Sequence, residues 1–119
     1  MRRRRFVAAS LAAVVATVAQ AHAFLDHAEP RVGSVVKVAP SEVKLWFNEQ
    51  IEPAFSSIQV LDSAGRRVDK NDVHVDPAQR EVLRISLQPL SQGAYSVKWR
   101  AVSVDTHVTN GSFGFRVAP

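Results

Sequence analysis

Short segments in which apolar and polar residues alternate constrain this chain more than any other feature. Five segments alternate clearly and two more weakly: residues 43–47, 57–61, 83–87, 95–101 and 113–117, then residues 24–28 and 73–75. Successive side chains of a β-strand point to opposite faces of the sheet, so a period of two indicates a strand with one buried face. No convincing helical pattern occurs after residue 22. The sequence therefore predicts about seven short β-strands.

Turn-forming residues separate these segments. They cluster at residues 30–33, 39–40, 62–65, 76–77 and 89–93. Strands interrupted by turns at intervals of about ten residues are typical of a two-sheet sandwich with Greek-key connections. Gly93-Ala94-Tyr95 is also similar to the tyrosine corner of such sandwiches. We expect an all-β, Greek-key, immunoglobulin-like (cupredoxin-like) β-sandwich formed by a single domain.

The first 21 residues have the pattern of a secretory signal peptide. Arg2 to Arg5 form a positive region, Phe6 to Val18 form an uncharged apolar stretch, and Ala19-Gln20-Ala21 offers small residues for cleavage. A stable membrane anchor needs about 20 apolar residues, and this stretch is shorter. We therefore expect cleavage of residues 1–21 and export of residues 22–119 to the periplasm, rather than an uncleaved anchor.

Two details of the leader affect the mature protein. Arg3 to Val7 partly fit a twin-arginine (Tat) signal, but consecutive arginines match many patterns, so we expect the general secretory (Sec) route. A second cleavage frame exists at Ala21-His22-Ala23. Cleavage after Ala21 leaves His22 at the amino terminus, whereas cleavage after Ala23 removes it. We expect cleavage after Ala21, which gives a mature domain of residues 22–119, and cleavage after Ala23 remains an alternative.

Composition narrows the possible functions. The net charge of +4 comes from Arg2 to Arg5, because the remainder holds 11 basic and 11 acidic residues. A balanced domain lacks the basic surface that nucleic-acid binding requires. The chain has no cysteine, and its only methionine is Met1. A metal site in the mature protein would therefore use histidines, carboxylates and the amino terminus.

Two short segments could supply such ligands to one ion. As the first residue, His22 would bind a metal through both its α-amine and its imidazole. Asp105-Thr106-His107 follows the strand that ends near Val102, and in an extended segment residues i and i+2 project to the same side. His22, Asp105 and His107 together form a nitrogen-rich set without sulfur, which suits Cu(II). We therefore expect one Cu(II) per chain.

The mature chain resembles the CopC family of periplasmic copper-resistance proteins over nearly all of its length. The matching residues are H-A-F-L at 22–25, V-K-L-W-F-N-E at 43–49, and W-R-x-V-S-x-D-x-H-x-x-x-G-x-x-x-F at 99–115. The resemblance implies a Cu(II) site in which His22 gives amine and ring nitrogens and His107 gives another nitrogen. Asp105 is expected at or near the metal. Glu49 matches a glutamate that approaches the metal in some members, and we expect it at most beside the ligands.

The chain differs from many family members in one respect, and the resemblance also implies a function. Many members have a methionine-rich loop for Cu(I), but no methionine lies between Phe55 and Val82. The chain is thus similar to the Cu(II)-only subgroup. The implied function is a non-catalytic carrier that buffers Cu(II) or delivers it to a partner such as an inner-membrane copper transport protein. We expect a monomer with no membrane span in its mature form.

Two other functions stay open at this point. A histidine that binds copper by amine and ring also occurs in copper monooxygenases and oxidases (the histidine brace), although a small domain leaves little room for a substrate surface. A plain immunoglobulin-like interaction module would make the histidines incidental and the Asp105-Thr106-His107 segment a polar turn. We expect His27 and His74 to be surface residues, the latter on an edge strand.

Overall fold

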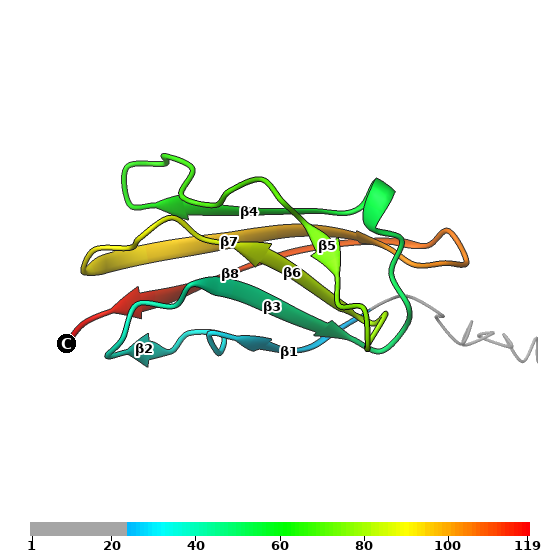
Figure 1. Cartoon of the computed structure of the whole chain (residues 1–119), viewed down its shortest axis with the longest axis horizontal. Helices are drawn as coiled ribbons and strands as arrows, with labels where there is room; N and C mark the ends of the chain where they lie inside the picture. The colour runs from blue at the N-terminus through cyan, green and yellow to red at the C-terminus, as the bar shows by residue number, and fades with distance from the viewer. Residues whose placement is uncertain (1–23) are drawn as a thin grey trace, which may run out of the picture.

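The computed structural model describes residues 24–119, which form two four-stranded β-sheets that face each other (Figure 1). The first sheet has the order β1–β3–β6–β5, formed by Leu25–Glu29, Glu42–Phe47, Val82–Ser86 and His74–Val75. The second has the order β2–β8–β7–β4, formed by Val35–Val36, Val108–Val117, Gly93–Val102 and Ser57–Asp62. A short 3₁₀ turn, η1 (Pro53–Phe55), lies between β3 and β4. The predicted signal peptide and His22 lie outside the described residues.

The connections have the form expected of a Greek-key sandwich. Among the described strands, the chain passes from one sheet to the other at β1–β2, β2–β3, β3–β4, β4–β5 and β6–β7, whereas β5 and β6 pair within the first sheet and β7 and β8 form a long antiparallel hairpin in the second. The all-β sandwich expected from the sequence is confirmed. The expected number of about seven strands omitted β2, which pairs in parallel with β8. Two residues are too few to show an alternation, so only the neighbouring strand identifies β2.

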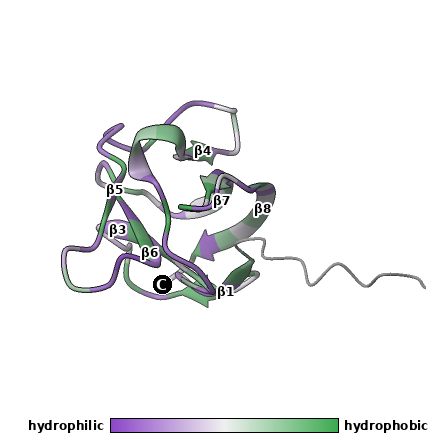
Figure 2. Ribbon diagram, turned by 90° about the vertical axis from the view of Figure 1, so that its right-hand side faces the viewer, coloured by the Kyte–Doolittle hydropathy of each residue, from purple (hydrophilic) through white to green (hydrophobic). Residues whose placement is uncertain are grey.

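The alternation in the sequence corresponds to the alternation in burial. In β3, Val43, Leu45 and Phe47 are buried while the residues between them are half-buried. The inward residues of both sheets form one core, which contains Leu83, Ile85, Val97 and Phe115 among others. Burial of such side chains contributes roughly 1.5–3 kcal/mol each. Figure 2 views the sandwich from one end, along the strands, coloured by hydropathy.

Two contacts explain why Tyr95, Trp99 and Gly111 occur in the patterns described above. The hydroxyl of Tyr95 donates to the carbonyl of Ser91 at 2.6 Å, which confirms the tyrosine corner. Trp99 lies directly opposite Gly111 on β8, and its ring packs edge-on against Phe47 with centroids 5.3 Å apart. A Cβ atom on Gly111 would lie 2.4 Å from the indole. The Trp and Gly of the W-R…G pattern are therefore packing partners.

The outer edge of β4 is covered by the segment that follows it. The buried carboxylate of Asp69 accepts a hydrogen bond from the backbone N–H of Val60 at 2.8 Å and pairs with Arg67 at 2.9 Å. An edge strand with unpaired N–H groups is a template for aggregation. Together with the backbone hydrogen bonds from Val68 N–H to the Val60 carbonyl and from Asp62 N–H to the Arg66 carbonyl, this contact occupies the edge of β4.

Residues 24–119 contain no helix that is long and apolar enough to cross a bilayer.

Candidate metal centre

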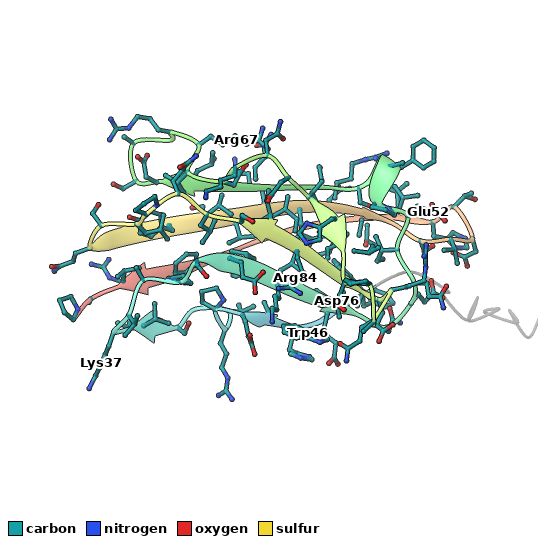
Figure 3. The ribbon with its side chains drawn as sticks, in the orientation of Figure 1. Lys37, Trp46, Glu52, Arg67, Asp76 and Arg84 are labelled. Atoms are coloured by element: carbon teal, nitrogen blue, oxygen red, sulfur yellow. The ribbon has the colours of Figure 1, made fainter. Side chains whose placement is uncertain are left out.

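Three segments meet at the end of the sandwich where β1 begins (Figure 1). Phe24 and Asn48 exchange hydrogen bonds: the Phe24 N–H donates to Asn48 Oδ1 at 2.6 Å, and the Asn48 N–H donates to the Phe24 carbonyl at 3.2 Å. The loop after Asn48 then runs beside the end of β7, where the Val104 N–H donates to the Gln50 carbonyl at 3.1 Å. Glu52, labelled in Figure 3, donates its N–H to the Val102 carbonyl at 2.8 Å. The first described residue, Glu49 and the β7–β8 loop are therefore joined through backbone contacts.

The β7–β8 loop brings Asp105 and His107 together through a tight turn. The N–H of Thr106 donates to the Ser103 carbonyl at 2.9 Å, and the N–H of Ser103 donates to the His107 carbonyl at 2.9 Å. Thr106 has φ +71°, which is unusual for a β-branched residue. The expectation of an extended segment is therefore wrong. The two side chains still meet, with His107 Nδ1 3.1 Å from Asp105 Oδ2.

The surroundings of Asp105 favour its ionised form. The hydroxyl of Ser103 donates to Asp105 Oδ1, and this hydrogen bond is the main cause that lowers the pKa of the Asp105 carboxyl below its ordinary value. Partial desolvation acts in the opposite direction, while the contact with His107 lowers the pKa further. The site thus contains a carboxylate near neutral pH. In metal-free protein, a proton on His107 Nδ1 would be donated to this carboxylate, and a metal ion held by both side chains would displace that proton.

Glu49 contributes a second carboxylate to the same end of the molecule. Its Oε2 atom is buried and has no hydrogen-bond partner among the described residues. Leaving a polar atom buried without a partner is costly, and for a charged group the cost is larger. A cation or a water molecule would satisfy this oxygen. The donors at this end are nitrogen and carboxylate oxygen, which are atoms that bind metal ions.

The described residues bring together only part of the predicted ligand set. Asp105 and His107 are in contact, Glu49 lies in the adjoining loop, and His22 is outside the described range. Within residues 24–119, no group of three or more histidine, aspartate or glutamate side chains could hold a metal ion. The described part of the chain thus presents an incomplete ligand set.

The other two histidines are surface residues, as the sequence predicts. The ring of His27 stacks on Trp46 on the outer face of the first sheet, with centroids 4.4 Å apart, and its Nδ1 lies 2.6 Å from Asp26 Oδ2. Trp46 is labelled on this face in Figure 3. His74 is exposed on the edge strand β5, with Nδ1 2.7 Å from the Asp72 carbonyl.

Sequence comparison identifies the family. A family model described as the CopC domain matches residues 25–118. The chain belongs to the CopC family. The crystal structure of CopC from Methylosinus trichosporium OB3b is similar to it with a TM-score of 0.77 and 37% identity, covering 82% of this chain and 95% of that one.

Two further relatives show how CopC domains vary. PcoC, a methionine-rich copper resistance protein from Escherichia coli, has a TM-score of 0.70 and 32% identity, covering 82% of this chain and all of that one. This CopC domain differs in having no methionine after Met1. The copper transport protein CutJ of Bacillus subtilis is 33% identical over 98 residues, which are 82% of this chain but only 18% of CutJ. A CopC-like sequence can thus form a small part of a much longer protein.

The structure adds two residues that sequence reasoning did not single out. Asn48 ties the start of β1 to the loop that carries Glu49, and Ser103 contacts both Asp105 and His107. Both lie within the sequence patterns shared with CopC proteins, at N of V-K-L-W-F-N-E and S of V-S-x-D-x-H. The patterns therefore marked these positions, but only the contacts indicate what they do.

Proposed function

We propose that this CopC protein is a non-catalytic Cu(II) carrier of the periplasm, which binds one Cu(II) through His22, His107 and Asp105. The observation that carries the proposal is the contact between His107 and the ionised Asp105, next to a loop that holds an unpartnered oxygen of Glu49. These groups offer nitrogen and carboxylate oxygen without sulfur, and such ligands suit Cu(II). The copper-resistance and copper-transport names of the relatives support the same metal.

The first ligand in this proposal requires removal of residues 1–21. Cleavage after Ala21 would free the α-amine of His22, so that one residue would provide two nitrogens in a single chelate. His22 is two residues before Phe24, and a chain of two residues reaches at most about 7 Å. Because Phe24 is bound to Asn48, this reach includes the neighbourhood of Glu49. The backbone contacts at this end therefore support a shared site.

The role of Glu49 in the proposal is secondary. Glu49 directly precedes Gln50, whose carbonyl accepts a hydrogen bond from the Val104 N–H. Its carboxylate would therefore be near the positive charge of a bound ion. We propose that it stabilises the loaded state by electrostatic attraction rather than by serving as a principal ligand.

The proposal extends to how the copper is used. A monomeric periplasmic carrier would buffer Cu(II) and deliver it to a partner, such as an inner-membrane copper transport protein. The match to CutJ supports this kind of partner, because there a CopC-like segment is joined to a long remainder in a protein named for copper transport.

A copper titration of protein that begins at His22 tests the proposal. Cu(II) affinity is measured against a competing chelator for this protein, for His22→Ala, and for a variant with one alanine added before His22. Tight binding should be lost in both variants, because each removes the amine–imidazole chelate. Binding should also weaken below neutral pH, because the nitrogens must lose protons to coordinate.

His27→Ala is the matched control, because it removes an exposed histidine of the same strand region without touching the proposed ligands. It should bind Cu(II) as the parent protein does. If the added alanine leaves the affinity unchanged, the amine is not a ligand and the proposed site is wrong.

A further inference from the structure

Ser103 is the first residue of the β7–β8 turn, and its backbone and side chain both form hydrogen bonds within that turn. It follows the last residue of β7, is fully buried, and forms an isolated β-bridge with Ile51 in the loop after β3. The residue therefore joins the loop that carries Glu49, through its backbone, to the turn that carries Asp105 and His107, through its hydroxyl. A buried hydroxyl in such a place needs hydrogen-bond partners.

The partners of this hydroxyl are the two proposed copper ligands. Ser103 Oγ donates to the carboxylate of Asp105 and accepts a hydrogen bond from the backbone N–H of His107 at 3.3 Å. It also lies 3.4 Å from the His107 carbonyl oxygen. A hydroxyl has one proton to donate, and an ionised carboxylate is the stronger acceptor, so the proton is directed to Asp105.

These contacts leave Asp105 held at both oxygens. Ser103 binds Oδ1, and Oδ2 is in contact with Nδ1 of His107. The carboxylate can thus orient the imidazole only while the hydroxyl orients the carboxylate. The turn itself contains Thr106 in a left-handed conformation, which an unsupported loop would tend to leave.

We propose that Ser103 is a positioning residue that fixes Asp105 and His107 in their binding geometry before copper arrives. This inference rests on the proposed function. Ligands that are already ordered lose less conformational entropy when they bind a metal. Loss of a group that orients metal ligands typically weakens metal affinity by about 10- to 100-fold.

A matched pair of serine variants tests the inference. Ser56 is also buried, and its hydroxyl also makes two hydrogen bonds, to the Glu52 carbonyl at 2.7 Å and from the Val102 N–H at 3.0 Å. Neither bond reaches Asp105 or His107. Ser103→Ala should weaken Cu(II) binding about 10- to 100-fold, whereas Ser56→Ala should change it less than about threefold. Thermal unfolding of both variants shows how much general stability each has lost.

Two further measurements separate positioning from mere stability. In a double-mutant cycle, Ser103→Ala should cost less affinity when Asp105 is already alanine, because the hydroxyl then has no carboxylate to orient. In metal-free protein, ¹⁵N–¹H correlation spectra of the His107 ring should show the proton held on Nδ1. Ser103→Ala should give a mixture of tautomers, and Ser56→Ala should not.

The outcomes distinguish the two proposals. If the unsubstituted protein does not bind Cu(II), the proposed function is wrong. If it binds, but Ser103→Ala and Ser56→Ala have equal affinities, the role of Ser103 is wrong and the site stands. Additive effects in the double-mutant cycle, together with unchanged ring spectra, would overturn the role of Ser103 as well.

Discussion

Gly111 offers the sharpest test of how the β7–β8 hairpin is packed. It faces Trp99 across the two strands, and a Cβ atom built on it would lie 2.4, 2.6 and 2.9 Å from three atoms of the indole ring. Ordinary contact begins near 3.4 Å. In Gly111→Ala the ring must therefore move by about 1 Å away from the new methyl group, which disturbs its edge-on contact with Phe47.

The magnitude follows from two opposing effects. Forcing an extra carbon into a packed site costs about 1–3 kcal/mol. Replacing glycine by alanine restricts the unfolded chain, which returns about 0.4–1 kcal/mol. Gly111 has no positive φ, so backbone strain adds nothing. The net expected loss lies between about 0 and 2.6 kcal/mol, with a middle value of about 1.3 kcal/mol, which corresponds to roughly 5–10 °C in melting temperature for a domain of this size.

Gly114→Ala is the control on the same strand. A Cβ atom there would lie 3.4 Å from the Tyr95 carbonyl oxygen and meet nothing closer. This variant should keep or slightly raise the stability, by up to about 1 kcal/mol. Urea unfolding followed by circular dichroism gives both free energies, and near-ultraviolet spectra report the Trp99 environment. If Gly111→Ala is as stable as Gly114→Ala, with unchanged aromatic spectra, the packing argument is refuted.

Three further outcomes are expected. Asp69→Ala should destabilise the domain by about 1–3 kcal/mol in urea unfolding, because it leaves the backbone N–H groups of Val60 and Asn71 without their acceptor; a loss below about 0.5 kcal/mol would contradict this. Glu49→Gln should leave the metal-free domain at least as stable while weakening Cu(II) binding, since it removes the negative charge of a half-buried side chain whose Oε2 atom has no hydrogen-bond partner among the described residues; loss of stability without loss of affinity would argue against a place near the metal. Hydrogen bonds from the hydroxyl and N–H of Ser86 lower the pKa of Asp72 from 3.8, so its contribution to stability is complete above about pH 4 and is lost as the pH falls through the lowered value. Asp72→Asn should therefore flatten the acid side of the stability profile, and an unchanged profile would contradict the assignment.

Local rules explain why so much of the fold could be predicted from the sequence. The period of two in residues 43–47 places Val43, Leu45 and Phe47 on one face whatever the strand pairs with, and these side chains are buried. The turn-forming residues separate the strands for equally local reasons. The short strand Val35–Val36 had no such signal, because its identity depends on hydrogen bonds to β8.

Part of the candidate site was also visible in the sequence. The absence of cysteine and the D-x-H spacing restrict the ligands to nitrogen and oxygen donors, and Asp105 and His107 do meet. The expected backbone conformation was wrong: residues 105–107 do not form an extended segment, because Thr106 has a left-handed conformation and turns the chain. A φ angle at one loop residue depends on the hydrogen bonds around it, which spacing alone does not reveal.

The sequence by itself determined the fold class and the family, and its lack of cysteine and of methionine after Met1 restricts any metal ligands to nitrogen and oxygen donors. These properties depend on residue types and on spacings within one segment. Only the tertiary structure decided which segments meet. It brings the Glu49 loop beside the end of β7, seats Trp99 on Gly111, and buries the Ser103 hydroxyl against Asp105. The first two contacts join residues from different strands and loops, and their register is set by the packing of the whole sandwich rather than by any local pattern. The Ser103–Asp105 contact lies within one turn, whose shape depends on the left-handed conformation of Thr106.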